Sequence, residues 1–254
     1  MNLVRSFFIA FSMYSKIPMP RTEWTKESMK YSMCFFPLIG AVIGGLVVLW
    51  NSLSVFLGAG TLFHSVILVL LPVLVTGGIH LDGLLDTADA LSSYKPMEEK
   101  LEILKDSHAG AFAIIVGICY FLLSLGIWSE AGSKAATVLA VGFVLSRALS
   151  GLAIVRFKLA KNTGLAATFS DMAVKGRVRF VMYLYILACA AAMLALDPVL
   201  GIAGLVGALG TFMYYRYMAY KKFGGITGDL AGFFLQVCEL VMAVFVVLTQ
   251  MCLA

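Results

Sequence analysis

The chain has 254 residues, of which 61% are hydrophobic and only 13% are charged. A soluble domain of this length cannot bury so much apolar surface, because surface area grows almost as fast as volume. The composition therefore excludes a soluble globular protein and leaves lipid as the solvent. The formal net charge of +5 requires no nucleic-acid partner, because membrane proteins carry an excess of Lys and Arg on one side.

Large apolar residues recur at helical spacing between residues 2 and 15. This pattern predicts an amphipathic helix that lies in the membrane interface, in contact with lipid. Lys16, Pro18 and Pro20 follow directly and cut the segment short. It is therefore too short to be the first spanning helix.

Seven apolar runs follow, each near the 20 residues that a transmembrane helix needs. Backbone polar groups in lipid must be satisfied within the segment, and no period-2 alternation suggests a barrel. We therefore predict an all-α, polytopic membrane helix bundle that forms one domain over residues 1–254. Gly77 and Gly78 could break or bend the second run near its end. The seven runs are Met33–Leu57, Thr61–Ile79, Ala109–Ser129, Ala135–Val155, Phe180–Leu196, Val199–Tyr217 and Ala231–Leu253.

The positive charges predict an orientation. All of the 19 Lys and Arg residues except Lys134 and Arg147 fall on one side of a seven-span topology. An excess of Lys and Arg marks the cytoplasmic side. We therefore expect the cytoplasmic (inner) membrane of a prokaryote, with the N-terminus inside and the C-terminus outside. The long loops 80–108 and 156–179 then form a cytoplasmic active face.

The most informative motif is the cytoplasmic segment 77–91, which contains Asp82, Asp86 and Asp89. Their spacing places the three carboxylates along one face of a helix. Like charges at this spacing repel each other. Mg²⁺ is the natural partner, because it usually bridges carboxylates to substrate phosphates. The motif predicts a magnesium site.

Two further motifs lie on the same face. In the first, Asp106 precedes the third run, followed by Ser107 and His108, and either caps that helix or joins the metal site. In the second, Gly224–Asp229, backbone amides could face a phosphate. Here Gly225, Thr227 and Gly228 are candidate substrate-binding residues, and Asp229 is a candidate metal ligand.

Two charges, Arg147 and Glu239, lie inside the membrane. At about 1.5 Å rise per residue, both sit about 12 Å from the cytoplasmic end of their helices. Equal depth allows a structural ion pair. In the alternative, Arg147 binds a substrate phosphate and Glu239 supports the metal. The sequence leaves both open. His80 and His108 lie on the active face, where they could assist proton transfer.

Aspartates suited to metal, a glycine-rich turn and basic loops point to phosphoryl-group chemistry at a membrane surface. The chain resembles the cobalamin synthase family, adenosylcobinamide-GDP ribazoletransferase, nearly from end to end. The His80–Gly83 block with Asp86 and Asp89 is highly specific. The other matching segments are Phe8–Phe11, Lys16–Pro20, Phe35–Gly40, Ile43-Gly44, Leu101–Ser107 and Gly224–Asp229 with Glu239.

The resemblance implies that a ribose hydroxyl of α-ribazole, or of its 5′-phosphate, attacks the cobinamide-linked phosphate of adenosylcobinamide-GDP. GMP then leaves, and Mg²⁺ is the expected metal. Asp82 is the first catalytic candidate, and Asp86, Asp89 and Asp106 stand beside it. Asp229 and Glu239 come next. The family pattern has Arg where this chain has His108.

Two alternatives come from other readings of the same acids. CDP-alcohol phosphotransferases also place aspartates on membrane helices, but their Ala-Arg pair is missing here. A cation transporter would line a path with acids, whereas here only Glu239 lies deep. The sequence leaves open whether the protein forms homo-oligomers and whether other enzymes of the cobamide pathway bind its loops.

Overall fold

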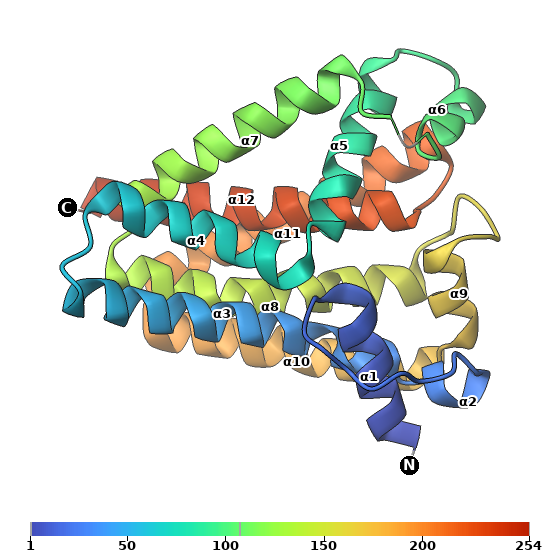
Figure 1. Cartoon of the computed structure of the whole chain (residues 1–254), viewed down its shortest axis with the longest axis horizontal. Coiled ribbons are helices and arrows are strands. Elements are labelled where there is room, and N and C mark those ends of the chain that lie inside the picture. Colours follow the sequence, from blue (N-terminus) through green and yellow to red (C-terminus); the bar gives the residue numbers. More distant parts are fainter. Residues whose placement is uncertain (1, 107, 254) are drawn as a thin grey trace.

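The computed structural model describes residues 2–106 and 108–253. Within these residues the chain forms twelve helices and no β-strand (Figure 1). The only β-type pairing in this part is an isolated parallel bridge between Leu159 and Ile226. The helices are α1 Asn2–Tyr14, α2 Lys26–Met29, α3 Ser32–Phe56, α4 Thr61–Thr76, α5 Ile79–Ser92, α6 Met97–Ile103, α7 Ala111–Glu130, α8 Ser133–Arg156, α9 Leu165–Met172, α10 Lys175–Leu196, α11 Pro198–Phe223 and α12 Gly228–Leu253.

Six helices, α3, α7, α8, α10, α11 and α12, are long and apolar enough to cross a membrane. The second predicted run is different. Its helix α4 ends at Thr76, and the chain bends by 95° into α5, so a seventh span exists only if this broken pair counts as one. The predicted all-α polytopic fold is confirmed, and the break falls at the two glycines that made the second run irregular.

Helix α8 is the centre of the bundle and packs against α3, α10 and α12 (Figure 1). Small residues make this packing close. A Cβ atom added at Gly40 or Gly44 of α3 would collide with the α8 backbone at Phe143 or Ala140. Small residues of this kind let membrane helices approach one another where lipid provides no hydrophobic driving force.

Large apolar side chains point outward from α7 and α10. Ile114, Ile118 and Leu122 of α7 are exposed, and so are Leu184 and Leu187 of α10. Exposed apolar surface of this extent is unusual for a soluble protein. It is the expected outer face of a bundle that lipid surrounds.

The predicted N-terminal helix is present as α1. Ile9, Ala10 and Phe11 are buried, whereas Leu3 and Val4 are exposed. The two long loops carry helices of their own, α5 and α6 in loop 80–108 and α9 in loop 156–179. Figure 1 shows α6 and α9 at one end of the bundle and the C-terminus at the other.

Candidate active site

The break between α4 and α5 turns the acidic helix across the end of the bundle. Gly77 and Gly78 have φ angles of 66° and 81°. This left-handed conformation is readily adopted by glycine and costs other residues strain. Thus α4 runs with the bundle, while α5 leaves that direction and crosses α12 (Figure 1).

Glycines bring α5 and α12 into close contact. A Cβ atom added at Gly83 would lie 2.5 Å from the carbonyl oxygen of Asp229. One added at Gly232 would lie 3.0 Å from the carbonyl oxygen of His80. Since side chains at these positions would separate the helices, the two glycines are what allows Asp229 to stand beside the aspartates of α5.

The aspartates of α5 form an acidic cluster with Asp229. Partial burial and then the charges of Asp82, Asp229 and Asp89 raise the pKa of Asp86 to about 6. Among the described residues, none donates a hydrogen bond to the carboxylate of Asp82 or of Asp86. A cation bound between these carboxylates would relieve their mutual repulsion. However, no three His, Cys, Asp or Glu side chains in the described ranges converge closely enough to enclose a metal ion.

Asp89 has a structural partner of its own. Its two carboxylate oxygens accept hydrogen bonds from the amides of Gly110 (2.6 Å) and Ala113 (2.9 Å). These amides belong to the first turn of α7, which otherwise leaves donors unpaired. Asp89 therefore caps α7 from a neighbouring helix, and the negative charge suits that end of the helix dipole.

Two cavities meet beside the acidic cluster, and they share Leu165, Ala166, Gly228 and Asp229. The aromatic cavity has a volume of about 300 Å³ and contains Asp82. Its other lining residues are Tyr14, Met33, Phe36, Ile79, His80, Ser150, Ile154, Ala231, Gly232 and Leu235. The lysine cavity has a volume of about 270 Å³ and is further lined by Leu104, Lys105, Lys161, Thr163, Gly164, Ile226 and Thr227.

Lys105 and Lys161 were not among the sequence candidates. Burial, and then the charge of Lys105, lowers the pKa of Lys161. Lys105 Nζ pairs with Glu102 Oε1 at 2.7 Å, and Lys161 Nζ donates to the Leu101 carbonyl at 2.7 Å. Each ammonium group has three donors, so this cavity wall is a candidate site for an anion. The sequence signal was the position of both lysines in the long basic loops, but many Lys and Arg residues share that feature.

The glycine-rich turn has a different role from the predicted one at its start. Gly225 is buried against Lys158 and Leu159, and its amide donates to the Ala219 carbonyl. The Thr227 hydroxyl accepts from the Leu230 amide, so Thr227 caps α12. Only Thr227 and Gly228 of the three predicted binding residues line a cavity.

Asp106 and His108, which precede α7, lie on the surface. The Asp106 carboxylate accepts hydrogen bonds from the backbone and ring nitrogens of His108, at 3.0 and 2.7 Å. This contact lowers the pKa of Asp106. The amides at the start of α7 are capped by Asp89 and not by Asp106. The predicted binding residue Ser107 lies outside the described residues.

His80 is in contrast 4% exposed, and its Nε2 atom has no hydrogen-bond partner among the described residues. Burial, and to a smaller extent the charge of Arg147, lowers its pKa well below the usual value. The ring is therefore neutral near pH 7. A neutral buried imidazole at a cavity wall offers one hydrogen bond to a ligand.

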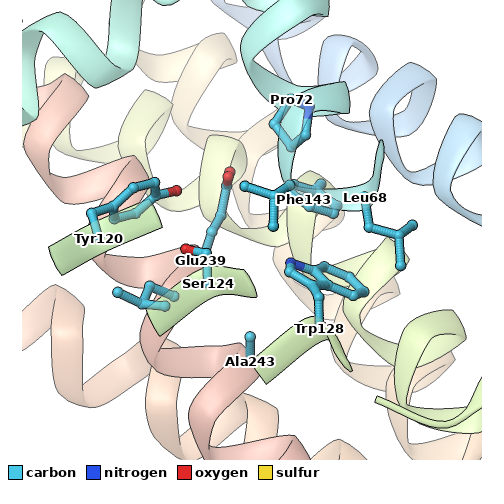
Figure 2. Close-up of a pocket in the computed structure, with 10 residues that line it drawn as sticks. Leu68, Pro72, Tyr120, Ser124, Trp128, Phe143, Glu239 and Ala243 are labelled. Atoms are coloured by element: carbon cyan, nitrogen blue, oxygen red, sulfur yellow. The ribbon is translucent and has the colours of Figure 1, made fainter. Parts of the chain in front are cut away.

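Arg147 and Glu239 form an ion pair inside the bundle. Arg147 Nη1 lies 2.6 Å from Glu239 Oε1, and the Ser146 hydroxyl donates to the same oxygen at 2.8 Å. Glu239 also lines a third, smaller cavity of about 30 Å³ together with Tyr120 and Ser124. Figure 2 shows the side chains around it. This space suits a water molecule and not a substrate.

Glu239 therefore does not join the acidic cluster. Ten residues of one helix separate it from Asp229, which corresponds to about 15 Å. The contacts support the structural-pair interpretation of Arg147 and Glu239, and neither residue lines the two cavities. The interpretation of Arg147 as a phosphate ligand and Glu239 as a metal ligand has no contact in its favour.

Comparisons with known proteins agree with the resemblance in the sequence. The family model of CobS, described as cobalamin-5-phosphate synthase, matches residues 6–247. A protein of Lachnoclostridium phytofermentans named adenosylcobinamide-GDP ribazoletransferase is 49% identical over 250 residues, which cover 98% of this chain and 96% of the relative.

More distant relatives carry the same name. One from Clostridium botulinum strain Alaska E43 is 32% identical, and the match covers 94% of this chain and 96% of the relative. Another from Pseudomonas syringae is 32% identical, with 92% of this chain and 95% of the relative covered. No solved structure matches the chain.

Proposed function

The chain belongs to the cobalamin-5-phosphate synthase family, and we propose that it acts as an adenosylcobinamide-GDP ribazoletransferase at the two cavities beside the acidic cluster. The observation that carries the placement is that Asp229 lines both cavities, with Asp82 in the wall of one and Lys105 and Lys161 in the wall of the other. Phosphoryl-group transfer needs positioning and charge neutralisation more than covalent help from the protein.

In the reaction, a ribose hydroxyl of α-ribazole, or of its 5′-phosphate, attacks the cobinamide-linked phosphorus. A new phosphorus–oxygen bond forms, and the bond from this phosphorus to the bridging oxygen breaks. GMP leaves with the bridging oxygen, and the hydroxyl proton is released. The product is adenosylcobalamin, or its 5′-phosphate when the nucleotide is the acceptor.

We propose Mg²⁺ as the cofactor, with one or two carboxylates of Asp82, Asp86 and Asp229 as its protein ligands, because three such side chains do not converge in the described residues. Mg²⁺ commonly binds one or two carboxylates and takes its remaining ligands from substrate phosphate and water. Bound there, it would neutralise negative charge on the diphosphate. Asp89 supports this group by holding α7 against α5, since its carboxylate oxygens already accept two amides.

Release of GMP tests this function. Detergent-purified protein should release GMP only when adenosylcobinamide-GDP, α-ribazole and Mg²⁺ are all present. Chelation with EDTA should stop the release, and excess Mg²⁺ should restore it. Release that persists in EDTA would refute the metal and leave the reaction standing. No release from well-folded protein would refute the reaction and favour a CDP-alcohol type of substrate.

We also propose that the end of the bundle with α6 and α9 faces the cytoplasm, in the inner membrane. The support is that nearly all Lys and Arg residues lie in segments at that side of the topology. Alkaline phosphatase fused after residue 254 should then be active, and the same enzyme fused within loop 156–179 should be inactive. The opposite result would invert the orientation.

A further inference from the structure

The two cavities beside Asp229 differ in chemistry, although they share a wall. Within the described residues, the lining of the aromatic cavity includes no Lys or Arg, whereas the lysine cavity has Lys105 and Lys161. A diphosphate needs positive partners when it leaves water, and an apolar wall offers none. The difference therefore separates the parts of the two substrates.

The aromatic cavity is built for a flat apolar ring. The rings of Tyr14 and Phe36 lie 4.5 Å apart, and Phe36 meets the ring of His80 at 5.8 Å. Ile154 and Leu235 add aliphatic wall. Aromatic side chains bind a planar ring by stacking or edge contacts.

The size and the polarity of the aromatic cavity indicate which part of the two substrates binds in it. A corrin macrocycle is far too wide for a cavity of about 300 Å³. Guanine would fit, but its edges carry amide and amine groups that need several hydrogen-bond partners. The two carboxylates in this wall, Asp82 and Asp229, are the proposed ligands of Mg²⁺ and are then not free to accept from guanine. A benzimidazole base has apolar edges and makes no such demand. One buried nitrogen, His80 Nε2, is free to meet a single polar group of the ligand.

We propose that the aromatic cavity binds the base and ribose of α-ribazole and that the lysine cavity binds the guanosine diphosphate link. This assignment rests on the proposed function. Asp229 and Gly228 belong to both walls, so the attacking ribose hydroxyl and the cobinamide-linked phosphate meet at their boundary. His80 is a binding residue for the nucleoside.

Variants that alter one cavity each test the assignment through separate KM values. Ala231→Leu adds bulk to the aromatic cavity only, and it should raise the KM for α-ribazole about 10-fold or more. Lys161→Met removes a charge from the lysine cavity only, and it should raise the KM for adenosylcobinamide-GDP about 10-fold. Each variant should change the KM for the other substrate less than about 2-fold, because it leaves the other cavity intact.

A second variant tests the aromatic cavity if Ala231→Leu does not fold. Ile154→Ala enlarges the aromatic cavity and should let the enzyme accept a nucleoside with a bulkier benzimidazole, with unchanged KM for adenosylcobinamide-GDP. The inference is overturned if either cavity variant mainly affects the other substrate, or if both affect the same one. Wild-type protein that releases no GMP refutes the proposed function instead, before any variant is compared.

Discussion

Replacement of Asp82 by Asn is expected to lower the rate of GMP release at least about 100-fold, which is typical for the loss of one preorganised electrostatic group. Asn keeps the size of the side chain and removes one negative charge from the acidic cluster. Asp82 is the exposed member of that cluster and faces the aromatic cavity. Initial rates at saturating substrates and Mg²⁺ measure the effect.

Stability distinguishes this loss from misfolding. The charge of Asp82 disfavours the ionised form of Asp86, so its removal should leave the unfolding temperature unchanged or raise it. A functional site that holds like charges together commonly becomes more stable when one of these charges is removed. Asp171→Asn is the matched control, because Asp171 is exposed on α9 and lines neither cavity. Undiminished release by Asp82→Asn would remove Asp82 from the chemistry and leave the family membership intact.

Replacement of Arg147 by Met is expected to destabilise the protein by about 3–5 kcal/mol, because it leaves a buried carboxylate without its partner. Glu239 is 9% exposed and Arg147 is fully buried, and a single water molecule in the small cavity beside Glu239 cannot replace the lost positive charge. The measurement is the unfolding of purified protein in detergent, followed by heat or by titration with a denaturing detergent.

The double variant Arg147→Met with Glu239→Leu should recover most of the lost stability, since neither charge is then left alone. Glu27→Gln is the surface control, because Glu27 of the Lys30–Glu27 pair is exposed and the loss of this pair should not move the transition. If Arg147→Met instead folds as stably as wild type but releases no GMP, the pair serves the site and the structural interpretation is refuted.

The apolar runs predicted the long helices well, because lipid imposes both the length and the hydrophobicity of a span. Their ends were less predictable. Helix α10 begins at Lys175, five residues before the predicted run that begins at Phe180, and α11 continues to Phe223, beyond the predicted run that ends at Tyr217. Basic residues at these ends are polar but still helical, so hydropathy alone predicts helices that are too short.

Local spacing predicted which face of α5 carries Asp82, Asp86 and Asp89, because helix geometry fixes it. It could not show that Asp89 caps α7, since its partner Gly110 lies on another element. The nearness of Lys105 to Lys161 is likewise a result of tertiary packing. Equal depth did allow the pairing of Arg147 with Glu239, because the rise per residue measures depth in a membrane helix.

The contact between α5 and α12 also has a consequence for biosynthesis. A ribosome delivers α5 and α8 to the membrane well before α12 exists. Until then Asp82 lacks Asp229, and Arg147 is held in lipid without a counter-ion, which is costly. Insertion of α12 relieves that cost and completes the acidic cluster in one step. A chain that ends before α12 lacks both Asp229 and Glu239, and we therefore expect it to release no GMP.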